Sequence, residues 1–158
     1  QNLEELRGKI VAFPAPAAFA ASILPRAEFS RQHIAIDERF VSSHDSVYRG
    51  VAQGSFAAGG GIKRTLEAID PAISAKLRTL ATTPAYVPHA FAAHPRLPAA
   101  TLQKVSTALQ GLDQDENGRQ LLAPLSFKGI EPADDKDWDE IRKLHIDLPV
   151  GKANKLQP

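Results

Sequence analysis

The sequence predicts an α/β protein built on a mostly parallel sheet that is flanked by helices. Two observations lead to this class. Short apolar runs alternate with segments of helical apolar spacing through the first 82 residues, and proline or glycine separates them, from a total of 12 prolines and 10 glycines. Strands that alternate with helices imply crossover connections between parallel neighbours. The hydrophobic share of 43% and the charged share of 23% are typical of a globular domain.

The predicted strands of this half are short and buried. The first, at residues 9–13, is an apolar run that follows a charged turn and ends at Pro14 and Pro16. Three later runs have the same character, so the four predicted strands lie at residues 9–13, 39–43, 55–58 and 76–82.

Helices are predicted between these strands. The alanine-rich stretch 17–29 has apolar residues at helical spacing, and Pro25 should kink or break it. A second helix should begin at Ser46, with Asp45 or Ser46 as its cap, and end at Gly54. A third should cover residues 62–69 and end at the Asp-Pro pair that follows.

The second half of the sequence is mainly helical. Residues 83–88 should be extended because the residue before each proline avoids the α region, and residues 89–93 continue as an apolar strand. Helices are expected at 98–112, around 121–125 and at 137–144, and residues 149–158 have the composition of a tail.

Charge and composition exclude several classes of protein. The formal net charge of the 158 residues is only +1, which argues against a strong nucleic-acid or membrane-surface binder. The absence of cysteine excludes disulfides and thiolate chemistry. Because methionine is also absent, even at position 1, we expect the chain to be a piece of a longer product whose targeting signal lies upstream.

Two turns could bind an anion. At the turn into the 17–29 helix, small side chains leave backbone N–H groups open at a helix start, although spacing alone favours a helix that simply packs closely on its sheet. His44 follows a predicted strand, at the edge where open parallel sheets place ligands. It could donate to an oxyanion there or belong to a capping turn, and the pattern leaves both open.

No group of residues combines a nucleophile, a base and an orienting residue, so an enzyme is not expected. A small α/β enzyme using His44 with Asp45 is the remaining catalytic alternative. The glycine triplet 59–61 lacks the lysine and hydroxyl of a P-loop. His89 and His94 should point to opposite faces of a strand, and the acidic cluster Asp134 to Asp139 is best explained as charge at a helix N-terminus, so no metal or other cofactor is expected.

Taken together, several segments resemble the substrate-binding components of phosphate/phosphite/phosphonate-type ABC transporters. The similarity covers nearly the whole chain, in matching order and spacing. The segments that carry it are residues 3–13, Ser43 to Val47, Gln53-Gly54 with the glycine triplet, residues 82–88, the helix after Arg96-Leu97-Pro98, and residues 137–142.

This resemblance implies a two-lobed periplasmic binding protein that captures a small ligand, such as phosphate, phosphonate or a related solute, in an interlobe cleft and delivers it to an ABC permease. Residues 1–86 would form the α/β domain of the second lobe, 87–148 the hinge return and C-terminal helices of a first lobe that lacks its opening part, and 149–158 the tail. The alternative is an extracellular sensing domain of a signalling receptor with the same fold.

The resemblance also indicates the ligand site. The backbone of Ala18, Phe19 and Ala20 would cradle an anion and His44 would donate to it. Positions where the family usually carries serine and threonine hydroxyls are apolar here. Further candidates for ligand contact are Ser22, Asp45, Gly60, Tyr86 and His89.

An incomplete first lobe would also have a consequence for association. Its C-terminal helices would lack part of the sheet that they normally cover, which would expose apolar surface. We therefore expect the chain to associate with itself or with the absent segment.

Overall fold

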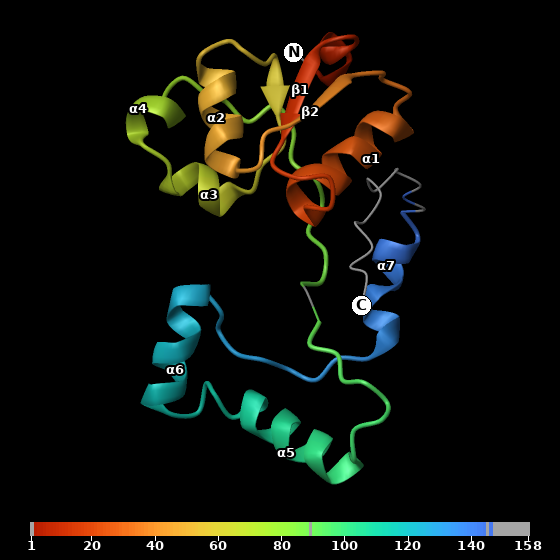
Figure 1. The fold of residues 1–158 in the computed structure, drawn as a ribbon, viewed down its shortest axis with the longest axis vertical. Coiled ribbons are helices and arrows are strands. Elements are labelled where there is room, and N and C mark those ends of the chain that lie inside the picture. The colour runs from red at the N-terminus through yellow and green to blue at the C-terminus, as the bar shows by residue number, and fades with distance from the viewer. Residues whose placement is uncertain (1, 89, 145, 147–158) are drawn as a thin grey trace, which may run out of the picture. The chain divides into compact units, whose positions relative to one another are not determined.

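The computed structural model describes residues 2–88, 90–144 and 146. The chain divides into two compact units, one built around Gln1–Ala85 and the other formed by Tyr86–Lys143. Figure 1 shows the elements of both. Each unit is described by itself below.

The first unit contains a parallel three-stranded sheet. Its strands are β1 (Ile10–Phe13), β2 (Asp37–Phe40) and β3 (Ala58–Gly59), in the spatial order β2-β1-β3. Phe13 pairs with Phe40 and Ala12 with Gly59, so all three strands end at the same edge. The predicted α/β class with a parallel sheet is confirmed, and the first three predicted strands are present within a few residues of their expected bounds.

Helices connect these strands. A π-helical segment η2 (Phe19–Ile23) runs directly into α1 (Leu24–Arg31), and α2 (His44–Ala52) joins β2 to β3. Pro25 follows the change from π to α geometry at Leu24, so the predicted break appears as a change of helix type and the chain remains helical from Phe19 to Arg31. The remaining helices of the unit are η1 (Leu3–Leu6), α3 (Lys63–Ala68) and α4 (Pro71–Ser74).

The two faces of the sheet are covered by two apolar clusters. Val11 and Phe13 pack with Leu6, Phe29 and Ile34 on one face, and Ala12 packs with Val47, Tyr48 and Ile69 on the other. Because successive residues of β1 point to opposite faces, this strand supplies both clusters. It is therefore the centre of the unit.

The predicted strand at residues 76–82 is wrong, because this segment has no ladder hydrogen bonds among the described residues. Leu77 packs against the cluster around Val47, whereas Leu80 packs against the cluster around Val11. These two leucines are three positions apart, and each packs on a different face of the sheet. The apolar residues of this segment are therefore explained by burial against the two clusters, not by pairing with a neighbouring strand.

The second unit is helical and exposes much of its apolar surface. Its helices are α5 (Ala99–Gln110), α6 (Glu116–Leu122), η3 (Ala123–Leu125), η4 (Asp135–Trp138) and α7 (Asp139–Arg142). Residues 90–93 are irregular, so the predicted strand there is wrong for those residues, and His89 lies outside the described residues. Among the described residues of this unit, no strand is available to pair with the segment.

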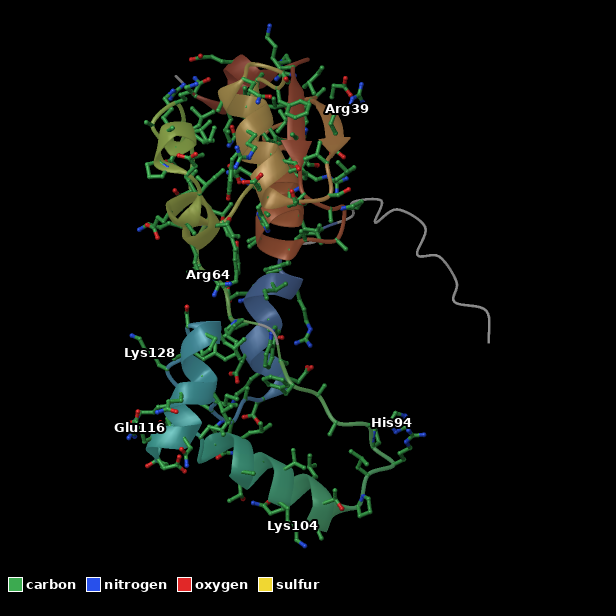
Figure 2. All side chains as sticks on the ribbon, turned by 60° about the vertical axis from the view of Figure 1, so that its left-hand side comes forward. Arg39, Arg64, His94, Lys104, Glu116 and Lys128 are labelled. Atoms are coloured by element: carbon green, nitrogen blue, oxygen red, sulfur yellow. The ribbon has the colours of Figure 1, made fainter. Side chains whose placement is uncertain are left out.

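The stripe predicted for the 98–112 helix is present but not covered. Leu102 and Val105 of α5 are 46% and 51% exposed, and no helix or strand in the described part of the chain packs extensively along α5. Figure 2 shows Lys104 projecting from the same helix. The expected exposure of apolar surface in this unit is thus observed.

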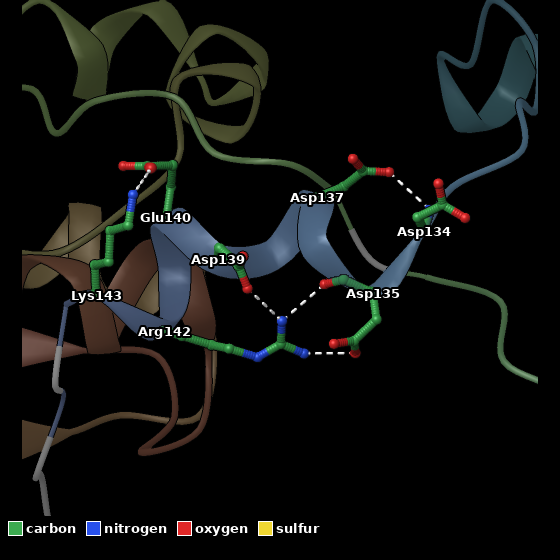
Figure 3. Close-up of polar contacts among 7 residues, drawn as sticks. All are labelled: Asp134, Asp135, Asp137, Asp139, Glu140, Arg142 and Lys143. Carbon is green, nitrogen blue, oxygen red and sulfur yellow. Dashed lines mark hydrogen bonds and ion pairs between the residues drawn. The ribbon is translucent and has the colours of Figure 1, made fainter.

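The acidic cluster near the end of the unit forms a helix start, as predicted. The backbone N–H of Asp134 donates to the Asp137 carboxylate at 2.7 Å, and Arg142 donates to Asp135 and Asp139 (Figure 3). These two carboxylates raise the pKa of Arg142, with the hydrogen bond to Asp139 as the larger cause. The carboxylates are thus used in a local network around η4 and α7.

Candidate functional site

The candidate site lies where the three parallel strands end. The N–H of Val41 donates to the carbonyl of Phe13 at 3.0 Å, and that of Gly60 donates to the carbonyl of Ala12 at 2.9 Å. The chain segments that leave β1, β2 and β3 are therefore neighbours at one edge of the sheet. Open parallel sheets bind ligands at this edge.

The segment after β1 presents unused backbone donors. The N–H of Ala18 donates to the carbonyl of Ala15 at 3.2 Å, so it is not available to a ligand. The N–H groups of Ala20 and Ala21 have no acceptor among the described residues, because they belong to the first turn of the continuous helix 19–31. Of the three predicted cradle residues, Ala20 is thus the one that the structure shows with an open amide. Ala21 was not predicted, although the rule for first-turn amides could have found it.

The segment after β2 starts α2. Ser43, rather than the expected Asp45 or Ser46, is the cap, because its hydroxyl accepts the N–H of Ser46 at 3.0 Å. His44 is the first residue of the helix and is half-buried. Its Nδ1 atom is buried and has no hydrogen-bond partner among the described residues. A buried imidazole nitrogen without a partner is unusual away from functional positions.

Asp45 is engaged by its own helix. Its carboxylate forms an ion pair with Arg49, one turn later, with 2.6 Å between Oδ2 and Nε. The hydrogen bond to this carboxylate raises the pKa of Arg49. The structure therefore gives Asp45 a partner on its own helix.

The segment after β3 is packed without any free space. A Cβ atom on Gly60 would lie 1.9 Å from the carbonyl oxygen of Ala21 and 2.7 Å from the Phe13 ring. A Cβ atom on Gly61 would lie 2.3 Å from the Tyr48 hydroxyl oxygen. Close approach of these neighbours thus requires glycine at both positions.

An ion pair between a buried arginine and a partly exposed glutamate links α1 to β2 near this edge. Arg26 of α1 has only 3% of its side chain exposed, and its Nε donates to Glu38 of β2 at 2.8 Å. Its guanidinium lies 5.5 Å from the centre of the Phe40 ring. This arrangement ties α1 to β2 through an ion pair and a stacked guanidinium. Sequence patterns gave no signal for it, because residues 26 and 38 meet only through the fold.

For three further predicted site residues, the first unit shows no accessible polar group at this edge or the residue lies outside that unit's described part. The Ser22 side chain is fully buried, and its hydroxyl has no partner among the described residues. Tyr86 belongs to the second unit, and His89 lies outside the described residues. The prediction for these residues stays a prediction.

A cavity of about 260 Å³ lies elsewhere in the first unit. It is between β3 and residues 76–80, and Glu5, Lys76 and Arg78 contribute to its lining. None of the predicted site residues lines it, so it is separate from the candidate site.

Comparison with known proteins identifies the family. None of the helices in the described part of the chain has the length and apolarity that a membrane crossing requires. A search among curated proteins gives no match. Residues 1–138 match the family model described as ABC transporter, phosphonate, periplasmic substrate-binding protein. This match covers most of the 158 residues and agrees with the α/β fold and the parallel sheet. The chain therefore belongs to the phosphonate-type periplasmic substrate-binding proteins of ABC transporters.

Proposed function

We propose that this chain binds a small oxyanion, such as phosphate or a phosphonate, at the carboxyl edge of its parallel sheet. The observation that supports the proposal is a set of polar groups without a partner among the described residues: the N–H groups of Ala20 and of the buried Ala21 at the start of helix 19–31, and the Nδ1 atom of His44 on the adjacent segment. Backbone N–H groups and the helix dipole both favour an anion at such a position.

In this site, backbone N–H groups would take the place of side-chain hydroxyls as donors to the anion. Ala18, Phe19 and Ala20 carry no hydroxyl group, so an oxyanion would be held by amides and by imidazole. Arg26, ion-paired with Glu38, braces the end of β2 beside this edge and adds no net charge to it. Gly60, without a side chain, lets the third segment approach the helix start closely. These features fit a binding role, and the family is one of binding proteins rather than enzymes.

The experiment is a calorimetric titration of the chain with inorganic phosphate, phosphite, methylphosphonate, 2-aminoethylphosphonate and uncharged sucrose. We expect at least one oxyanion to bind and sucrose to give no heat. His44→Ala should lower the affinity for the bound oxyanion roughly 10- to 150-fold, which corresponds to the loss of a hydrogen bond to a charged group of about 1.5–3 kcal/mol.

His94→Ala is the matched control. His94 is exposed in the second unit (Figure 2), and its Nδ1 accepts the N–H of Arg96. The control should retain the affinity of the unmodified chain. Binding of sucrose alone, or equal affinities for both alanine variants, would contradict the proposed site.

The family implies an ABC permease as partner, and delivery to it is the role that we propose for the ligand-bound form. The alternative is a sensing domain of the same fold. A membrane-spanning helix encoded after residue 158 in the same gene would favour the sensor, whereas ligand-dependent binding to a permease would favour the transporter.

We also propose that the second unit associates through its apolar surface. Phe91 and Leu121 are 72% and 66% exposed, and α5 leaves Leu102 and Val105 uncovered. Apolar surface of this extent favours association. Light scattering at high protein concentration should give a mass above that of the monomer.

Two variants of α5 test this association. Leu102→Ser combined with Val105→Ser should lower the measured mass toward the monomer. Lys104→Ser changes an exposed residue of the same helix and should leave the mass unchanged. A chain that is already monomeric at high concentration would refute the proposal.

A further inference from the structure

We infer that Tyr48 is a positioning residue of the candidate site, which fixes the segment after β3 against the start of α2. This inference rests on the proposed function, because it concerns the same edge of the sheet. Tyr48 lies one helical turn after His44 and is only 6% exposed. Its apolar spacing alone predicts an ordinary core residue.

The Tyr48 hydroxyl closes a ring of hydrogen bonds with the segment after β3. It accepts the backbone N–H of Ile62 at 3.2 Å and lies 2.7 Å from the Thr65 hydroxyl, which in turn donates to the Ile62 carbonyl at 2.9 Å. A phenol has one proton and two acceptor positions. Donation to Thr65 with acceptance from Ile62 therefore satisfies all three groups at once.

The same hydroxyl sets the position of the glycine segment. Gly61 packs directly on it, since a Cβ atom there would lie 2.3 Å from the hydroxyl oxygen, and Gly60 packs on the carbonyl of Ala21. Residues 60–62 are thus held between the helix start after β1 and the side chain of Tyr48. Movement of this segment would change the place where the open amides of Ala20 and Ala21 lie.

Tyr48 also neighbours His44. The centres of the two rings are 6.4 Å apart, with 34° between their planes. The tyrosine therefore contacts both the helix start that carries His44 and the segment after β3. Because its hydroxyl is fully used by Ile62 and Thr65, we assign it positioning rather than ligand contact.

Tyr48→Phe tests this role because it keeps the ring and removes only the hydroxyl. The probes are inorganic phosphate and methylphosphonate, with affinity measured by calorimetry. Amide hydrogen exchange of the ligand-free chain is the second readout. We expect five- to tenfold weaker binding and at least tenfold faster exchange of the Ile62 N–H, with unchanged exchange at Val11 and Ala12 in the sheet. Thr65→Val keeps the hydrogen bond from the Ile62 N–H to Tyr48. In this variant, the changes in log affinity and in log exchange rate should each be less than half of those in Tyr48→Phe.

The outcomes separate the two proposals. Faster exchange at Ile62 with unchanged affinity would make Tyr48 merely structural and overturn the inference. Unchanged exchange at Ile62 would overturn the hydrogen-bond ring itself. If the unmodified chain binds neither anion, the proposed function fails and the positioning role fails with it, and exchange at Ile62 in Tyr48→Phe then tests the hydrogen-bond ring alone. Binding by the unmodified chain with unchanged affinity in Tyr48→Phe overturns the positioning role and leaves the proposed function standing.

Discussion

Gly60→Ala should lower both the stability of the first unit and its affinity for an oxyanion. The added Cβ atom would lie 1.9 Å from the carbonyl oxygen of Ala21 and 2.7 Å from the Phe13 ring. A backbone carbonyl cannot turn away as a flexible side chain can, so the helix start or β3 must move. We expect a loss of about 1–3 kcal/mol in the free energy of unfolding, as for other overpacked sites. The affinity for the bound oxyanion should fall about tenfold or more, because the amides of Ala20 and Ala21 move with the carbonyl.

The measurements are urea unfolding and calorimetric titration of the same variant. Gly129→Ala is the control, because the nearest atom to its added Cβ would be a carboxylate oxygen of the Asp113 side chain at 3.3 Å. That side chain can move at little cost. Stability and affinity equal to those of the unmodified chain in Gly60→Ala would show that the close approach has no role in binding or folding.

Phe13→Ala should destabilise the first unit most strongly. The Phe13 side chain is fully buried at the carboxyl end of the central strand and packs with Val11, Phe29 and Ile34. Replacing a buried phenylalanine by alanine costs about 3–5 kcal/mol through lost burial and the cavity that remains. The midpoint of urea unfolding should fall while its slope stays constant.

Phe40→Ala provides the comparison for this variant. The Phe40 ring lies 6.0 Å from that of Phe13, at the matching position of β2, but it is 41% exposed. Partial exposure reduces the expected loss to about 1–2 kcal/mol. Equal losses for the two variants would contradict the assignment of β1 as the centre of this core.

The site residues differ in how far the sequence could predict them. His44 could be placed at the sheet edge, because it lies between the predicted strand 39–43 and the predicted helix that begins at Ser46. The open amide of Ala20 follows from the same logic at the end of β1. Tyr48 could not be separated from an ordinary apolar helix position, since its hydroxyl partners Ile62 and Thr65 lie 14 and 17 residues away.

By itself, the sequence determined the α/β class, the order of the first three strands along the chain and the helices between them. Local apolar spacing, proline and glycine act within a few residues, and they are sufficient to define such elements. Only the tertiary structure decided that β1 lies between β2 and β3, that residues 76–82 pair with no strand in the described part of the chain, and that Arg26 meets Glu38. Pairing and burial depend on residues far apart in the chain, because a strand's partner and a side chain's neighbours are set by the packing of the whole unit.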